Sequence, residues 1–172
     1  MFLITLSFKA WCAPEFKDAP RINDIQFGVP CTINVNNEYE DILNYQGMMF
    51  SKKSIYDRLA SLNEKASSNA IWLIHAPPSG MGLDVCAHGD CAGSHAVLKF
   101  ITEVQPMLTI HGHIHESPEY NGKKWYQKCG NTLCVQNGQL DEDLNYSMIE
   151  VSDGKVVSMK HSKYGEALCL KK

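Results

Sequence analysis

Two apolar segments that end in histidine restrict the possible folds of this chain more than any other feature. Residues 107–110 run directly into a turn that carries His113 and His115. Residues 71–74 run into His75, which is followed by two prolines. Short apolar runs of this kind are typical of buried strands, and proline forbids both a helix and a continued ladder beyond the second run. The pattern predicts an α/β fold in which two strands deliver histidine at their carboxyl ends.

These three histidines are candidate metal ligands. In α/β sheets, ligands bind in the crevice outside the carboxyl ends of the strands, and neutral imidazole is the most common protein ligand for transition metals. On extended backbone, side chains at i and i+2 point to the same side, so we expect His113 and His115 to face one volume. Gly112 has no Cβ and lets the backbone approach a ligand. The alternative is a structural His75 and two histidines on a surface loop.

Five motifs follow one another in the middle of the chain, at residues 74–78, 93–101, 105–106, 111–117 and 131–138. In order and spacing they resemble the C-terminal half of the calcineurin-like metallophosphoesterases, and a weaker similarity at residues 41–62 extends the match. The resemblance implies an α/β domain built like the C-terminal half of the four-layer α/β/β/α sandwich of that family. We expect residues 1–172 to form this single domain, incomplete at its N-terminus, with residues 1–40 atypical.

The resemblance also implies a hydrolase of phosphate esters that uses divalent metal ions, which would be manganese, zinc or iron. In a two-metal site, the ions bind a bridging water as hydroxide and stabilise charge on the entering and leaving groups. By resemblance, His75 and His113 would be ligands of the second metal and His115 a ligand of the first. The Asp-x-His, Gly-Asp and Gly-Asn-His-Asp/Glu turns of the family's first half do not occur before His75. The chain therefore carries half of a ligand set, and no catalytic residue is assigned.

The absent turns leave three hypotheses open. The first is a metal-dependent phosphoesterase-like hydrolase, impaired unless a partner chain or unrecognised carboxylates such as Asp84, Asp90 or Glu116 complete the site. The second is a non-catalytic module of the same fold that binds a protein partner. The third is a structural zinc-binding loop protein.

The third hypothesis rests on a loop with four potential zinc ligands, Cys86, His88, Cys91 and His95. Their composition suits a tetrahedral zinc site, but the C-x-H-x2-C-x3-H spacing matches no common zinc finger. The alternative is a glycine-rich substrate loop, in which His88, Asp90 and His95 would be the residues near the substrate.

Composition argues against several other classes of protein. The 172 residues suffice for one domain with a sizeable core, and a net charge of −3 without a basic stripe predicts no nucleic-acid partner. Seven cysteines, an odd number, favour reduced thiols in the cytoplasm. The apolar residues 1–8 fall far short of the ~20 needed to span a membrane, so no membrane partner is expected. They favour a core strand or an aberrant start over a signal peptide.

Periodicity and capping residues predict the remaining elements. Helices are expected at residues 51–62, with Ser51 as N-cap, and at residues 94–104, with Ser94 as N-cap. Tight turns are expected at Asn121-Gly122, Asn137-Gly138 and Asp153-Gly154, and the last of these should join a hairpin. Strands are predicted at residues 124–126, 132–135, 146–151 and 156–160, and residues 13–37 are predicted to be irregular.

Overall fold

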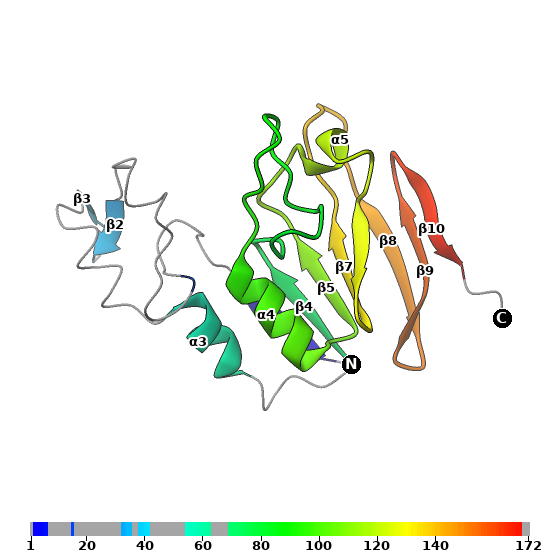
Figure 1. Cartoon of the computed structure of the whole chain (residues 1–172), viewed down its shortest axis with the longest axis horizontal. Helices are drawn as coiled ribbons and strands as arrows, with labels where there is room; N and C mark the ends of the chain where they lie inside the picture. The colour runs from blue at the N-terminus through cyan, green and yellow to red at the C-terminus, as the bar shows by residue number, and fades with distance from the viewer. Residues whose placement is uncertain are drawn as a thin grey trace.

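A mainly parallel β-sheet forms the centre of the molecule (Figure 1). The structure, a computed structural model, describes residues 2–6, 15, 32–35, 38–41, 54–62 and 69–169. In spatial order the strands of this sheet are β1 (Phe2–Leu6), β4 (Ala70–Ile74), β5 (Leu108–His111), β7 (Thr132–Gln136) and β6 (Tyr126–Cys129). The first four run parallel, and β6 runs antiparallel to β7. With the helices described next, this sheet confirms the predicted α/β class.

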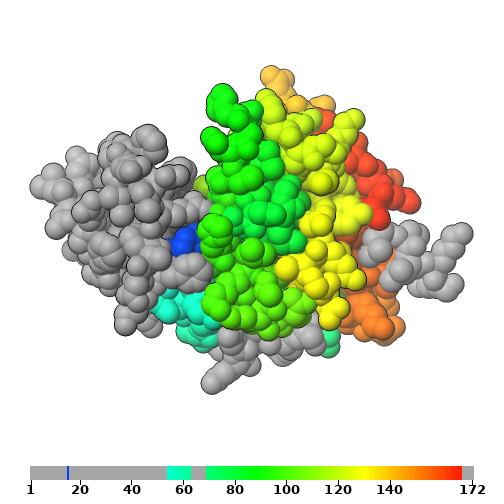
Figure 2. Space-filling view, viewed as in Figure 1, coloured from blue at the N-terminus to red at the C-terminus, as the bar shows by residue number. Residues whose placement is uncertain are grey.

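Two helices lie on one face of the sheet. Helix α4 (His95–Val104) begins as predicted, where Oγ of Ser94 accepts a hydrogen bond from the N–H of Val97 at 3.1 Å. Helix α3 (Ile55–Ala60) packs against α4, and the two lie side by side in Figures 1 and 2. It begins later than predicted, because Ser54 caps it by accepting from the N–H of Asp57 at 3.0 Å. Ser51, the predicted cap, lies outside the described residues.

A second, antiparallel sheet has the spatial order β10 (Gly165–Cys169), β9 (Lys155–His161), β8 (Ser147–Ser152). The predicted hairpin joins β8 to β9 through a loop of two residues, Asp153 and Gly154. Their φ angles are 50° and 70°. Positive φ at both loop positions is the geometry of a type I′ turn, whose twist matches that of the strands it joins. Turn chemistry in the sequence was therefore sufficient to place this hairpin.

Alternation along β4 divides the core into two parts. Trp72 belongs to the cluster under the helices, where its ring meets Phe100 edge to face with 4.6 Å between centroids. Its neighbour Ile71 belongs to a second cluster that contains Val135 of β7 and Met159 of β9. Successive side chains of a strand point to opposite faces, so one strand serves both clusters. These two helices and two sheets thus form three layers: helices, the five-stranded sheet and the three-stranded sheet.

The N-terminal residues contain strands, in part where none was predicted. Strand β1 pairs in parallel with β4 at the edge of the sheet, which confirms that the start of the chain contains a strand. Strand β2 (Thr32–Val35), which pairs with β3 (Glu38–Asp41), corrects the prediction that residues 13–37 are irregular. Its alternation of polar and apolar residues covers only the four residues TINV, too few to stand out in a segment rich in proline and asparagine. Among the described residues, no helix is long and apolar enough to cross a membrane.

Three further elements differ from the predictions. Strand β6 starts two residues later than the predicted start at residue 124, because its register with β7 is fixed by the tight turn that joins Cys129 to Thr132. Helix α5 (Ser117–Tyr120) is a single turn with Pro118 near its start, too short to show a helical period. Strand β10 was not predicted, although it contains the three consecutive apolar residues Ala167, Leu168 and Cys169.

Glu15 ties the N-terminal part of the chain to both helices. Its Oε2 accepts hydrogen bonds from Oγ of Ser94 at 2.6 Å and from the N–H of Ala96 at 2.8 Å. Its carbonyl accepts from the N–H of Tyr56, beside the start of α3, at 3.2 Å. The first N–H groups of a helix lack intrahelical acceptors and form the positive end of its dipole, so a buried carboxylate is favoured there.

Candidate metal centre

His75 and His113 meet at the carboxyl ends of two neighbouring strands. His75 follows β4 directly and His113 lies two residues beyond β5, and these strands are parallel partners. Nε2 of His75 lies 3.2 Å from Nδ1 of His113, and the ring centroids are 5.0 Å apart with an interplanar angle of 68°. The side chain of His75 is exposed and that of His113 is half-buried, so the facing nitrogens are open to solvent on one side.

The separation of 3.2 Å has two chemical meanings. If one nitrogen is protonated, the rings form a hydrogen bond. If both are unprotonated, their lone pairs converge and can bind one cation. Two nitrogen ligands of a tetrahedral zinc ion, each at 2.0–2.1 Å, lie about 3.3 Å apart. The observed pair therefore fits two positions in the coordination shell of one metal ion.

His113 adopts a strained backbone conformation. Its φ is 72°, and the N–H of Ile114 donates to the carbonyl of Gly112 at 2.9 Å across it. This hydrogen bond closes a three-residue γ-turn of the kind with positive φ, which is rare for residues other than glycine. Such conformations cost on the order of 1–3 kcal/mol and persist only where the surroundings impose them. The turn is what directs the ring of His113 toward His75.

Gln136, the last residue of β7, supports this turn from the neighbouring strand. It is buried, and its Nε2 donates to the carbonyl of Gly112 and, at 3.1 Å, to that of Ile114. These two carbonyls flank His113. Two hydrogen bonds at about 1 kcal/mol each are enough to offset much of the strain of the turn.

His111 makes the equivalent contact with the end of β4. Its Nδ1 lies 3.0 Å from the carbonyl oxygens of both Ile74 and Ala76, which flank His75. Carbonyls only accept, so Nδ1 carries the proton, and Nε2 accepts from the hydroxyl of Thr109 at 2.8 Å. Burial lowers the pKa of His111 to about 4, so the ring is neutral at pH 7. The N–H of Gly112 donates a further hydrogen bond to the carbonyl of His75 at 3.0 Å, which continues the ladder between β4 and β5.

Gly112 is less constrained than the sequence suggested. A Cβ at this position would lie 3.6 Å from Nδ1 of His75, which is an ordinary contact, and its φ is not in the left-handed region. The backbone there approaches the His75 ring, as expected, but the approach does not require glycine.

The structure does not bring His115 to the pair. Within residues 54–62 and 69–169 and the described N-terminal strands, no group of three or more His, Cys, Asp or Glu side chains could hold a metal ion. His115 is exposed, and its carbonyl accepts from the N–H of Gln139 at 2.8 Å. The expectation that His113 and His115 face one volume assumed extended backbone. The γ-turn at His113 breaks that geometry, so the i, i+2 rule does not apply.

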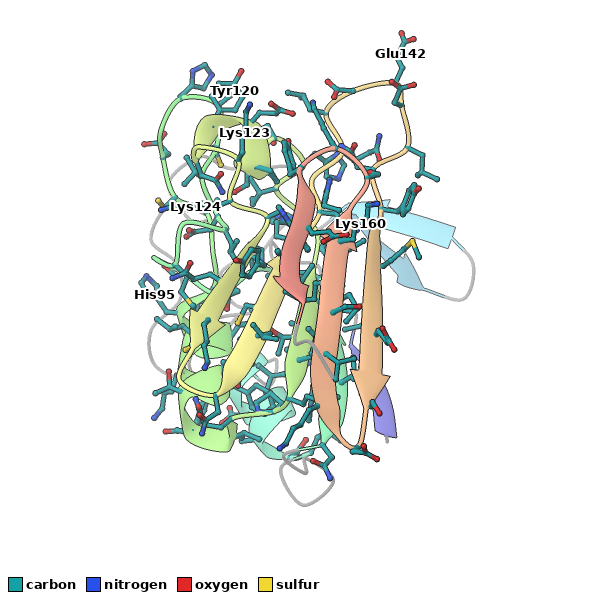
Figure 3. The ribbon with its side chains drawn as sticks, turned by 90° about the vertical axis from the view of Figure 1, so that its right-hand side faces the viewer. His95, Tyr120, Lys123, Lys124, Glu142 and Lys160 are labelled. Carbon is teal, nitrogen blue, oxygen red and sulfur yellow. The ribbon has the colours of Figure 1, made fainter. Side chains whose placement is uncertain are left out.

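The four residues of the alternative zinc site are not gathered into one centre either, since the described chain holds no such group. Cys86 and Cys91 lie on the two arms of a short loop closed by a bridge between Val85 and Cys91, and burial raises the pKa of both thiols. His88 is exposed near the tip, beside the exposed Asp90. His95 projects from the first turn of α4 at the outer edge of the molecule (Figure 3).

Asp84 organises this loop rather than the histidine pair. It is fully buried, and its Oδ2 accepts from the N–H groups of Gly80 at 3.0 Å and Gly93 at 3.1 Å. The approach is so close that a Cβ on Gly93 would lie 2.6 Å from Oδ2. Glu116 accepts from the N–H of Ala87 at 3.3 Å, on the other side of the loop. These carboxylates therefore hold backbone groups of the loop.

Sequence reasoning missed the two supporting side chains, His111 and Gln136. Both fall inside motifs that were matched, at residues 111–117 and 131–138, but neither was given a role. Their position in the sequence could have indicated this role, because each is a hydrogen-bonding side chain at the end of an apolar strand. A polar side chain there is buried only if it finds partners on the neighbouring strand.

Comparison with models of known protein families gives no match. Comparison with curated protein sequences gives none either. Among solved structures, the chain is similar to the crystal structure of TT1561 of Thermus thermophilus, with 24% sequence identity and a TM-score of 0.39 over 62% of this chain and 40% of that one. A second crystal structure is similar at 23% identity and a TM-score of 0.46, over 62% of this chain and 37% of that one. The chain thus spans less than half the length of either protein.

Proposed function

We propose that this protein is a metallophosphoesterase-like metal-binding protein in which His75 and His113 hold one divalent cation, and that its hydrolysis of phosphate esters is weak. The observation that carries the proposal is the 3.2 Å between Nε2 of His75 and Nδ1 of His113 at the ends of adjacent parallel strands. The motifs that contain both histidines, in the order seen in the calcineurin-like family, support the same assignment. The cation would be manganese, zinc or iron.

The residues fit one cation better than two. Both imidazoles are neutral ligands, and the described residues place no carboxylate with them in a group of three. Two dications held a few ångströms apart repel strongly unless an anionic ligand lies between them. Among the described residues, this balance favours single occupancy.

The chemistry available to such a centre is limited. A bound cation would supply Lewis acidity toward a phosphoryl oxygen and lower the pKa of bound water. His75 and His113 would orient it at the open end of the sheet, where one side faces solvent. The described residues supply neither a bridging carboxylate nor an identified proton donor for the leaving group, so turnover is expected to be far below that of a complete two-metal hydrolase.

Metal analysis and turnover test the proposal together. Purified chain is equilibrated with manganese or zinc and assayed with an activated phosphodiester and an activated phosphomonoester in excess manganese. We expect one ion per chain, lost in His75→Ala and in His113→Ala, and only slow turnover. His95→Ala, which removes an exposed histidine on the first turn of α4, is the matched control and should retain the ion. His115→Ala should also retain it.

Two results would contradict the proposal in different ways. Two ions per chain with robust turnover that vanishes in His113→Ala would mean that other carboxylates complete a two-metal site. Failure of the wild-type chain to bind any ion better than His113→Ala would remove the metal site and favour a non-catalytic role.

A non-catalytic interaction module is the second candidate function, and strand β8 supports it. Met148 of β8 is exposed by 63%, and Leu144 and Tyr146, in the segment that leads into this strand, are exposed by 75% and 50%. Strand β8 lies at the edge of the three-stranded sheet, which faces the viewer in Figure 3. An edge strand with apolar side chains can pair with an extended segment of a protein partner. Sedimentation of the wild-type chain and of Met148→Glu would test the simplest partner, a second copy of the chain.

A cytoplasmic location belongs to the same proposal. Within the described side chains, Cys86, Cys91, Cys129 and Cys134 are free. Free thiols are typical of reducing compartments.

A further inference from the structure

The carboxyl ends of three neighbouring strands are linked by a repeated contact. His111 at the end of β5 holds the two carbonyls that flank His75. Gln136 at the end of β7 holds the two carbonyls that flank His113. His111 and Gln136 are themselves register partners on adjacent parallel strands. Each histidine of the pair is therefore bracketed by a buried side chain from the next strand along the sheet.

We propose that His111 and Gln136 are the positioning residues of the histidine pair: they fix the backbone on both sides of His75 and His113, so that the facing nitrogens stay at the separation needed to share one cation. This inference rests on the proposed metal site. Neither side chain needs to touch the cation or the substrate.

Gln136 carries the larger share of this role because His113 is the residue with the unfavourable backbone. Without an external contact, a residue at a φ of 72° relaxes readily toward ordinary extended or helical backbone, which would swing its ring away from His75. The amide of Gln136 spans the γ-turn and bonds both of its outer carbonyls, so relaxation of the turn would break both bonds. Gln136 therefore acts on the backbone conformation of His113 and does not contact its ring through these bonds.

The burial of Gln136 also points to a role for its amide hydrogens. Only 1% of the residue is exposed, and within the described part of the chain Oε1 has no hydrogen-bond partner. A buried, unsatisfied acceptor is unfavourable. The two hydrogen bonds that the NH2 group donates are therefore the favourable contribution of this side chain. If the amide were turned over, Oε1 would face two carbonyl oxygens and repel both.

Removal of the amide should leave the fold intact. The carbonyl of Ile114 still accepts from the N–H of Ser117 at 3.2 Å. In Gln136→Met, a side chain of similar volume fills the space. When the γ-turn opens, the carbonyl of Gly112 also loses the N–H of Ile114, and water can replace this donor because Gly112 is only half-buried. Gln136→Met therefore removes the preference of His113 for the γ-turn.

Two readouts on one set of variants test the inference. The first is the nuclear Overhauser effect between ring protons of His75 and His113 in metal-free protein, whose ring centroids are 5.0 Å apart. The second is the dissociation constant of Co2+, followed by its visible absorption. The variants are Gln136→Met and His111→Phe, with His111→Asn as the conservative variant that retains an N–H donor. Unfolding by urea reports stability separately.

The control variant removes a similar contact at another place in the fold. Gln105 also donates its amide to two carbonyls, at 2.9 and 3.3 Å, but at the end of α4. Gln105→Met should lose stability while the ring contact and the Co2+ affinity stay unchanged.

We expect Gln136→Met and His111→Phe to lose the ring contact and to bind Co2+ about tenfold more weakly or worse, as removal of a supporting shell around a metal site commonly does. His111→Asn should restore most of the affinity. If Gln136→Met fails to fold, Gln136→Asn, whose amide is one methylene shorter, replaces it.

Retention of both the ring contact and the Co2+ affinity in Gln136→Met and His111→Phe would overturn the inference and leave the proposed function intact. If wild-type chain binds Co2+ no better than His113→Ala, the proposed metal site fails. The ring contact in metal-free protein then still decides whether His111 and Gln136 position the pair.

Discussion

Acidification should destabilise this protein through His111. The ring is buried and neutral, and burial lowers its pKa from 6.5 to about 4. In the unfolded chain the same ring takes up its proton near pH 6.5. Protonation between these two values therefore favours the unfolded state, so the stability is fully present above pH 6.5 and is lost progressively as the pH falls toward 4.

The size of the effect follows from the width of this window. While the unfolded chain holds a proton that the folded chain does not, each pH unit lowers the free energy of unfolding by about 1.4 kcal/mol. From pH 6.5 to about 4, His111 alone should remove about 3 kcal/mol. Since domains are stable by roughly 5–15 kcal/mol, this loss is a large part of the total.

The assay is urea unfolding at several pH values in the presence of a chelator, which excludes any contribution from bound metal. His111→Asn keeps an N–H donor and removes the titrating ring. Its free energy of unfolding should fall much less steeply with pH than that of the wild type, and the two curves should diverge by about 3 kcal/mol at pH 4. His95→Asn, which removes an exposed imidazole, controls for the change in overall charge.

Parallel curves for the wild type and His111→Asn between pH 6.5 and 4 would refute this reasoning. They would mean that the ring is already protonated in the fold or is accessible to water. The direct check is the ring proton resonance of His111, which should show no titration above about pH 5.

Three further predictions concern stability and thiol reactivity. Glu15→Ala should lower the free energy of unfolding by about 2 kcal/mol, because two N-terminal groups of α4 lose a charged acceptor; a change below about 0.5 kcal/mol in urea unfolding would show that the N-terminal part does not dock there. Phe100→Ala should cost about 3–5 kcal/mol in the same assay, since it opens a cavity against Trp72 in the core, whereas Phe100→Leu should cost less. Thiol titration without reductant should find the cysteines free in denaturant, while Cys134 stays unreactive in native protein at about pH 8, because burial raises its pKa to about 12; rapid native labelling at Cys134 would contradict its burial.

Much of the local structure could be predicted from the sequence. The two apolar runs that end in histidine became β4 and β5, and Ser94 caps α4 as its position before an amphipathic segment indicated. Asp153-Gly154 closes the last predicted hairpin. These features depend on interactions within a few residues, such as capping, side-chain periodicity and positive φ at a turn, and a single sequence contains that information.

The site was predicted in part. That His75 and His113 come together could be inferred, because parallel neighbours deliver their carboxyl ends to the same edge of a sheet. The place of His115 could not, because the γ-turn at His113 depends on a contact with Gln136, 22 or more residues away along the chain. Extended backbone was the reasonable local expectation, and a long-range hydrogen bond overrides it.

The sequence by itself determined β4, α4, β5, β7 and the hairpin of β8 and β9, and where histidines leave the sheet. Only the tertiary structure decided that β1 lies beside β4, that His111 turns inward to the end of β4, and that the amide of Gln136 spans the turn at His113. The physical reason is that strand order and register choose which buried polar groups meet. A hydrogen bond between residues 37 apart, such as that from His111 to Ile74, exists only after the strands have been brought together.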